Sequence, residues 1–369
     1  MNKSVTGRLP CPLALSRGAQ TNIGPALLLL AVPGYGFSRR CIQEPLSLLI
    51  LSIVHPKNSQ AQHLCCDNYF ALDMLTPLKH NMSVNRLDSK TREQVIGCLI
   101  EGCSIRATVR MTGIAKKTVM RVLVEVGEVC ADFQDRTFRN LRSRRLQVDE
   151  VWTWIYCKEK NRTQEIALKN PDAGDIWLWV AIDADSKLVP SWRLGQRDLA
   201  TARDFIGDLA SRLSKRVQIT SDGHRPYLQA IEGEFGADVD YAQLQKIYGA
   251  PTDEESRRYS PARCIGCDMK VVSGDPDPRH VSTSFVERQN WTVRTNMRRY
   301  TRLSNGFSRS LRNHAASTAL NYFAYNFIKI HRTLRMTPAK AAGVTGRLWD
   351  VSDLVALWEQ YERRAERAA

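Results

Sequence analysis

The strongest constraint on this chain is an apolar, β-prone stretch at 146–156, LQVDEVWTWIY, that carries a carboxylate in its middle. In a strand, apolar side chains at 146, 148, 152, 154 and 156 share one face, while Val151 and Ile155 fall on the other. Asp149 therefore interrupts a hydrophobic strand. A carboxylate in such surroundings is costly unless a cation meets it, so the pattern predicts a cation site on a buried sheet.

Asp222 occupies a comparable position. It closes the run Val217, Ile219, Thr220 and is followed by Gly223, so we expect it at the carboxyl end of a buried strand. Ligand sites in α/β sheets favour that location. Most of the 38 Asp and Glu residues of this chain are expected to be solvated surface charges, and context alone distinguishes Asp149 and Asp222 from them.

Glu287 opens an arginine-rich segment, because residues 288–312 contain seven arginines and no acidic residue. Such a run is ordinarily a solvated face, but one so one-sided repels itself unless an anion is near. If 283–300 is helical, Asn290, Arg294 and Arg298 follow Glu287 on one face. Guanidinium forks match phosphates bidentately, so we expect Arg294 and Arg298 to contact DNA phosphate.

Three carboxylates with phosphate-binding arginines are typical of phosphodiester chemistry. Two Mg²⁺ ions about 3.5 to 4 Å apart can activate an attacking oxygen and stabilise the leaving one. Mg²⁺ prefers hard oxygen ligands, which Asp and Glu supply. The three acids therefore predict a site for Mg²⁺ or Mn²⁺, and no nucleophilic Ser or Cys is required.

Four segments carry a resemblance to a known family: VDEVWTWI, IWLWVAID, TSDGHRPY and FVERQNWTVRTNMRRYTRLSNGFSRS. They resemble the catalytic core of bacterial insertion-sequence transposases of the insertion sequence 1 type, over about 146–340. The resemblance implies a ribonuclease H-like fold and metal-dependent cutting and joining of transposon ends. It also implies an acidic triad of catalytic, metal-binding residues: Asp149, Asp222 and Glu287.

Two alternatives to a transposase stay open. A nuclease or resolvase of the same fold would cut DNA without joining it. A catalytically inactive, transposase-derived regulator would bind DNA but need not keep all three acids, and their joint presence disfavours it.

Periodicity predicts an α/β domain at 146–340. The expected strands are 146–156, 176–183, 187–194, 217–221 and 238–244, and the expected helices are 199–213, 224–233, 283–300 and 308–331. The order βββαβαβα is the one that the resemblance implies. Residues 245–282, with four prolines, are expected to be an inserted loop. Within it, a lone CxxC at Cys264 and Cys267 favours two unpaired thiols over a zinc site.

An all-α helix-turn-helix domain is expected at 82–130, before the catalytic core. Helices are predicted for 90–100, 104–110 and 115–129, with a turn at Thr112 and Gly113. Lys116, Lys117 and Arg121 lie early on the last helix, where DNA contacts are made. An ordinary helical hairpin is the alternative. The basic linker 131–145 adds two further expected DNA contacts, Arg144 and Arg145. Many family members have a four-cysteine zinc ribbon before this unit, and this chain lacks that spacing.

The net charge of +15 favours a polyanionic partner. We expect that partner to be double-stranded DNA, both transposon ends and target, bound by a homo-oligomer that brings two ends together. Ten cysteines without a regular framework indicate a reducing bacterial cytoplasm, with the protein at the nucleoid and no membrane association. Residues 1–81 are expected to be a disordered or misassigned extension, and 341–369 a C-terminal helical tail.

Overall fold

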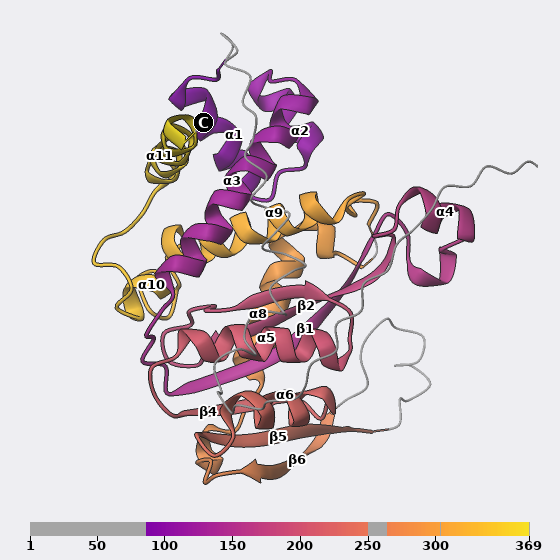
Figure 1. Ribbon diagram of the computed structural model, residues 1–369, viewed down its shortest axis with the longest axis vertical. Coiled ribbons are helices and arrows are strands. Elements are labelled where there is room, and N and C mark those ends of the chain that lie inside the picture. The colour runs from indigo at the N-terminus through magenta and orange to yellow at the C-terminus, as the bar shows by residue number, and fades with distance from the viewer. Residues whose placement is uncertain (1–85, 250–263, 303, 369) are drawn as a thin grey trace, which may run out of the picture. The chain divides into compact units, whose positions relative to one another are not determined.

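The computed structural model describes residues 86–249, 264–302 and 304–368. The expected extension at 1–81 lies outside them. Within the described residues, six strands form one mixed sheet in the order β3-β2-β1-β4-β5-β6 (Figure 1). The strands are β1 (Arg145–Ile155), β2 (Gly174–Asp183), β3 (Trp192–Gly195), β4 (Val217–Ser221), β5 (Val239–Tyr248) and β6 (Cys264–Ser273).

The central strand β1 pairs antiparallel with β2 and parallel with β4. β4 pairs parallel with β5, whereas β3 and β6 add to the two edges in antiparallel fashion. The helices α5 (Leu199–Arg212) and α6 (Pro226–Phe235) make the two crossovers to these parallel strands. The predicted order βββαβαβα is therefore present, with one additional strand, and is consistent with a ribonuclease H-like sheet.

The third expected strand, 187–194, is shorter than predicted, because β3 begins only at Trp192. The preceding backbone bonds to β2 at Leu188 and Ser191, whose carbonyls accept from Asp183 N and Ala181 N, and a side chain holds the residue after Leu188. Asn326 accepts a hydrogen bond from Val189 N at 3.0 Å and donates one to Val189 O at 3.0 Å. Pro190 follows and has no N–H to donate to a sheet. The expected strand is therefore buried as predicted, and its regular strand structure is confined to the residues from Trp192 onward.

The expectation of a loop throughout 245–282 is wrong. β5 continues to Tyr248, and β6 pairs with it antiparallel over nearly its whole length. Isoleucine and valine in CIGCDMKVVS favour a strand, and the free edge of β5 supplies the hydrogen-bonding partner that a local pattern does not reveal. Residues 274–283 contain only a short 3-10 turn, Pro278–His280. Residues 250–263 lie outside the described part of the chain.

Helices cover both faces of the sheet. Side chains of α5 and α6 form one core with Leu146, Val148 and the inner residues of β4 and β5. On the other face, α8 (Ser284–Asn296) and α9 (Leu311–Phe323) pack with Val151 and Ile155. The alternation predicted for β1 therefore assigns its two faces correctly, and this assignment fixes where the acidic side chains of β1 point.

A third core joins the N-terminal helices to the C-terminal ones. It contains residues of α1 (Ser89–Ile100), α3 (Lys116–Thr137), α9, α10 (Pro338–Ala341) and α11 (Val351–Ala368), while α2 (Ile105–Thr112) packs against it. α3 and α9 approach closely at Gly127, where an added Cβ would lie 2.4 Å from Ala316 O. In the described part of the chain, no helix is both long enough and apolar enough to cross a bilayer.

Three segments differ in extent or packing from what the sequence predicts. α3 continues to Thr137, so the expected linker 131–145 is helical in its first half. Its buried residues Gln134 and Phe138 belong to the core and hold it there. The expected tail 341–369 also packs: Arg92 of α1 pairs with Glu362 at 2.9 Å and lies 4.2 Å from the centre of the Trp358 ring. The expected helix 308–331 is α9 followed by one π-helical turn, Ala324–Ile328.

Candidate metal centre

The register between β1 and β4 brings Asp149 and Asp222 together. The two strands pair from Arg145↔Gln218 to Gln147↔Thr220. Beyond that pair they separate, and each strand carries an aspartate two residues later. Parallel strands that part at their carboxyl ends leave a crevice in which ligands bind. Two residues that are 73 positions apart in the sequence thus face one another across a short gap.

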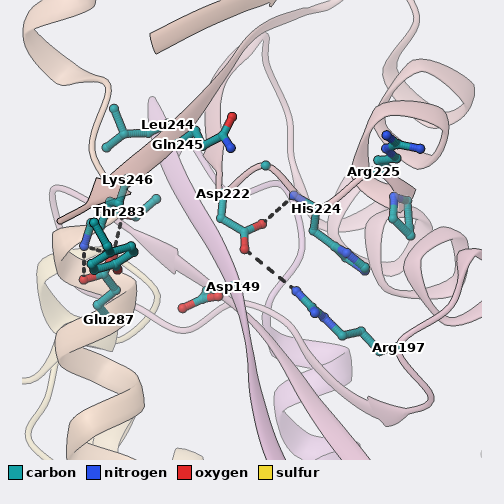
Figure 2. A pocket seen from close by; sticks show the side chains of 13 residues that line it. Asp149, Arg197, Asp222, His224, Arg225, Leu244, Gln245, Lys246, Thr283 and Glu287 are labelled. Atoms are coloured by element: carbon teal, nitrogen blue, oxygen red, sulfur yellow. Dashed lines mark hydrogen bonds and ion pairs between the residues drawn. The ribbon is translucent and has the colours of Figure 1, made fainter. Parts of the chain in front are cut away.

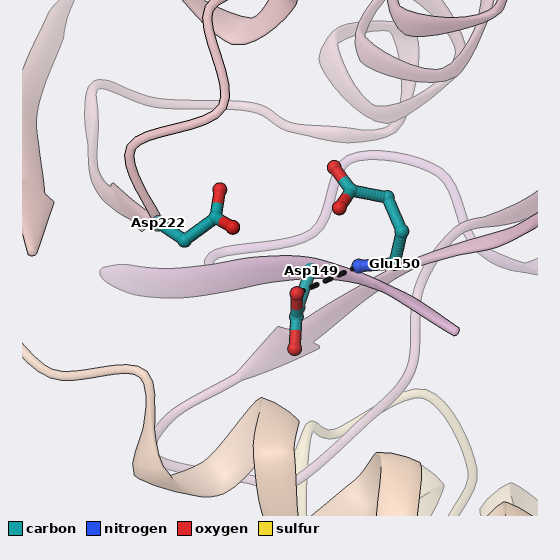
Figure 3. A group of neighbouring side chains, drawn as sticks. All are labelled: Asp149, Glu150 and Asp222. Carbon is teal, nitrogen blue, oxygen red and sulfur yellow. Dashed lines mark hydrogen bonds between the residues drawn. The ribbon is translucent and has the colours of Figure 1, made fainter. Parts of the chain in front are cut away.

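Glu150 completes a group of three acids (Figure 3). One carboxylate oxygen from each of Asp149, Glu150 and Asp222 lies within 4.8 Å of the others. Asp149 and Glu150 are successive residues of a strand, so their side chains leave it on opposite sides. Glu150 is only 2% exposed, and its Oε1 has no hydrogen-bond partner. This cluster has the ligand types that bind a divalent cation.

Hydrogen bonds position each acid. The Asp149 carboxylate accepts from the Glu150 N–H and from the side-chain amide of Asn290 on α8, both at 2.8 Å. Asp222 accepts from the His224 N–H at 2.9 Å, which closes the turn after β4. Arg197 lies 3.9 Å from Asp222 and 3.5 Å from Glu150. The described contacts therefore leave room around these oxygens for a further ligand.

Glu287 reaches the same crevice from α8. The helix is anchored to β1 by Gln147, whose buried side-chain oxygen accepts from Phe285 N at 2.8 Å and Val286 N at 3.1 Å. These are first-turn N–H groups that would otherwise lack an acceptor, because Thr283 provides no side-chain cap. Gln147 and Asp149 lie on the same face of β1, so one strand fixes both the start of α8 and the acid that α8 faces.

Figure 2 shows the resulting pocket, an open cavity of about 800 Å³. Asp149, Asp222 and Glu287 all line it, together with Arg197, His224 and Arg225. Glu287 does not belong to the tight group of three, and its carboxylate is bound by Lys246 of β5. The pocket therefore contains all three acids that the sequence singled out, with one of them paired to a lysine.

Burial is the main reason that the pKa values of two of these acids are raised, and the charges of the neighbouring acids add to it. Burial raises the pKa of Asp149 to about 7; the hydrogen bond from Glu150 N opposes this, and the charges of Asp222 and Glu287 add to it. Burial and the charges of Asp222 and Asp149 raise the pKa of Glu150 to about 8. A bound cation would remove much of this cost, because it favours the ionised carboxylates.

The predicted DNA-binding residues lie in three places. Lys116, Lys117 and Arg121 are exposed at the start of α3, and Arg121 is 3.8 Å from Glu125. Arg144 is exposed before β1. Arg145 is partly buried and is ion-paired with Asp185.

The two arginines after Glu287 do not share a helical face. α8 ends at Asn296, so Arg298 belongs to the following 3-10 turn and is exposed there. Arg294 is partly buried and donates to Tyr300 O at 3.0 Å. This bond folds the chain back after α8, and a continuous helix at 283–300 is therefore wrong. Cys264 and Cys267 are exposed free thiols on β6.

Sequence reasoning missed three residues of this site. Glu150 is adjacent to Asp149, and the pair of acids inside an apolar strand was a visible signal. Gln147 gave a weaker signal, because it is a polar residue on the face of β1 that α8 and α9 cover. Lys246 gave none, since its strand was expected to end before it.

No protein-family profile matches the chain, and no curated protein matches it in sequence. Among solved structures, the simian T-cell lymphotropic virus intasome in complex with a PP2A regulatory subunit is similar in part. The sequences are 14% identical, the match covers 68% of this chain and 74% of that chain, and the TM-score is 0.33. The superposition is too loose to assign a fold or an activity.

Proposed function

We propose that this protein is a DDE transposase with a ribonuclease H-like catalytic domain, which cleaves DNA at insertion-sequence ends and joins them to a target. The observation that supports this best is the register of β1 and β4, which sets Asp149 and Asp222 face to face. Glu287 lines the same open pocket from α8. The motifs of insertion-sequence transposases around these three acids give the pocket its proposed reaction.

The acids fit Mg²⁺ or Mn²⁺. The three clustered donors are carboxylate oxygens, which these hard cations prefer over sulfur or imidazole ligands. The pKa values of Asp149 and Glu150 are raised by burial and further by neighbouring carboxylates, so a bound cation would stabilise their ionised forms. Divalent cations bound there would activate the attacking oxygen and stabilise the leaving one. Asp149, Asp222 and Glu287 are the proposed ligands, and Glu150 is a fourth oxygen source beside them.

Cationic residues of the pocket would hold the DNA backbone. Arg197 and Arg225 line it, and Arg225 is exposed. Their guanidinium groups can bind phosphate oxygens bidentately and orient the strand to be cut. Arg294 lies in the last turn of α8, the helix that carries Glu287, and Arg298 lies just beyond its end. Both are proposed to contact phosphates farther along the strand.

End recognition is proposed for α2 and α3. Gly113 between them is in the left-handed conformation that ends α2, and the turn allows α3 to project Lys116, Lys117 and Arg121 together. In helix-turn-helix proteins the start of the second helix contacts base edges and phosphates. Double-stranded DNA is the proposed partner, with a homo-oligomer holding two ends during strand transfer.

Asp222→Asn tests this function. We expect the variant to lose Mg²⁺-dependent cleavage of DNA that contains the element's ends, because one carboxylate ligand is replaced by a neutral amide. DNA binding, measured by fluorescence anisotropy, is expected to stay within about twofold, since α2 and α3 are untouched.

Strand transfer is measured in the same reactions with a pre-cut end and a supercoiled target plasmid. Joining by the wild type but not by D222N is the expected result. Cleavage without joining would favour the nuclease or resolvase alternative. Cleavage by D222N at the wild-type rate would remove the acidic group from the mechanism.

A further inference from the structure

Lys246 forms a close ion pair with Glu287 (Figure 2). Its Nζ lies 2.5 Å from both carboxylate oxygens, and the hydroxyl of Thr283 donates to Oε1 at 2.6 Å. Lys246 is 29% exposed and comes from the outer part of β5, beside the pocket opening. The Glu287 carboxylate is thus occupied at each oxygen by a protein cation.

The other acids of the pocket are held differently. Arg197 approaches Asp222 and Glu150 at 3.9 and 3.5 Å, which is about 1 Å or more longer than the contact between Lys246 and Glu287. Asp149 is bound by two neutral N–H donors. Among these four described acids, Glu287 is therefore the one whose two oxygens a single cation covers at short range.

A metal ion and Lys246 would compete for the Glu287 oxygens. Mg²⁺ binds carboxylate oxygens at about 2.0–2.1 Å and brings two positive charges. An ammonium that already lies 2.5 Å from both oxygens would be repelled by that charge, so metal binding favours its release from the carboxylate. Lysine suits this exchange because its charge sits on a flexible four-carbon stem.

We infer that Lys246 is a displaceable counter-ion that links metal binding to DNA binding. It holds Glu287 in the empty pocket, and it moves to a phosphate oxygen of DNA when a divalent cation takes the carboxylate. The inference rests on the proposed function. Since breaking the ion pair opposes metal binding and a phosphate offers Lys246 a new partner, each ligand favours the other.

Mn²⁺ binding tests this role without any measurement of catalysis. Free Mn²⁺ is titrated by electron paramagnetic resonance with the full chain, in the absence of DNA, for the wild type and Lys246→Met. We expect K246M to bind Mn²⁺ roughly three- to tenfold more tightly, because no ammonium competes for Glu287. A short DNA duplex is expected to tighten Mn²⁺ binding by the wild type more than binding by K246M.

Lys270→Met is the matched control, because Lys270 lies on β6 and on the opposite face of the β5–β6 pair from Lys246. K246R keeps the cation and should resemble the wild type. K246Q provides a second neutral variant if K246M melts early. Equal Mn²⁺ affinity in the wild type and the neutral variants would overturn the inference, as would an equal effect of DNA on both.

A different result would overturn the proposed function itself. If the wild type binds no more Mn²⁺ than a variant that lacks both Asp149 and Asp222, the pocket is not a metal centre. In that case K246M would also bind Mn²⁺ no more tightly than the wild type. The low Mn²⁺ affinity of the wild type would then show that the metal site, and not the role of Lys246, is the failed assumption.

Discussion

Replacing Asp149 by Asn should make the metal-free protein more stable at pH 8. The pKa of Asp149 rises from an ordinary 3.8 to about 7 because the side chain is buried, with further contributions from the charges of Asp222 and Glu287. Each pKa unit corresponds to about 1.4 kcal/mol. Ionising this carboxyl in the folded, metal-free pocket therefore costs about 4 kcal/mol, which is the upper limit of the gain.

The direction in which stability changes with pH follows from the protonation of Asp149 in the unfolded and the folded protein. Above pH 4 the unfolded chain has released this proton, whereas the folded protein keeps it until about pH 7. The folded state thus binds more protons in this range, so its stability falls as the pH rises. The loss begins near pH 4 and is complete above pH 7. Asn cannot ionise, and the variant lacks this loss.

The local hydrogen bonds tolerate the change. The Glu150 N–H can donate to the amide oxygen of Asn as it does to Asp149 Oδ1. Asn290 now donates to Oδ2, but its own Oδ1 is buried without a partner. A flip of the Asn290 amide would let that oxygen accept from the new NH₂ group, but it would place the Asn290 NH₂ where the unpartnered oxygen now lies, so the gain falls below its upper limit.

The assay is urea unfolding in EDTA at pH 4, 6 and 8, followed by circular dichroism. We expect the variant and the wild type to agree at pH 4, and the variant to be more stable by about 2–4 kcal/mol at pH 8. Asp172→Asn, at an exposed aspartate, controls for loss of one negative charge. A D149N protein that is no more stable than the wild type at pH 8 would refute the reasoning. Adding Mn²⁺ should stabilise the wild type and remove most of the difference.

Three further predictions concern the rest of the site and its supports. Glu150→Gln should weaken Mn²⁺ binding about tenfold, since it removes one of three acids whose oxygens lie within 4.8 Å; titration with Mn²⁺ checks this, and unchanged affinity would exclude Glu150 as a ligand. Gly127→Ala should lower the free energy of unfolding by about 1–3 kcal/mol, because the added Cβ would meet the Ala316 backbone at 2.4–2.6 Å; denaturant titration measures it, and a neutral effect would mean that α3 and α9 separate freely. The triple change of Lys116, Lys117 and Arg121 to Ala should weaken duplex binding and reduce the slope of log affinity against log salt by about one for each phosphate that is no longer neutralised; an unchanged slope would place the DNA elsewhere.

Glu150 and Glu287 raise the question of which acid completes the centre. Glu150 is nearer to Asp149 and Asp222, whereas Glu287 is held at the pocket wall by Lys246. Both arrangements are compatible with two cations, one near each glutamate. The Mn²⁺ stoichiometry of the E150Q and E287Q variants separates one shared site from two.

Local sequence patterns predicted most of the elements and the faces of the central strand. Period-2 alternation in 146–156 assigned Val151 and Ile155 to the side that α8 and α9 cover, and helical spacing located α5 within one residue. It also identified three acids that line one pocket. These features depend on the spacing of apolar residues along the chain and on the cost of an unpaired charge among apolar side chains. Both can be read from the sequence.

The surroundings of those acids depend on contacts between distant segments of the chain. β6 forms because β5 offers an edge, β3 begins late because Asn326 binds the backbone before it, and α8 is seated by Gln147. Lys246 meets Glu287 across 41 residues, and Glu150 becomes a ligand candidate only once β4 lies beside β1. Each of these contacts joins distant segments through a hydrogen bond or ion pair, and no local periodicity encodes which partner a polar group will find.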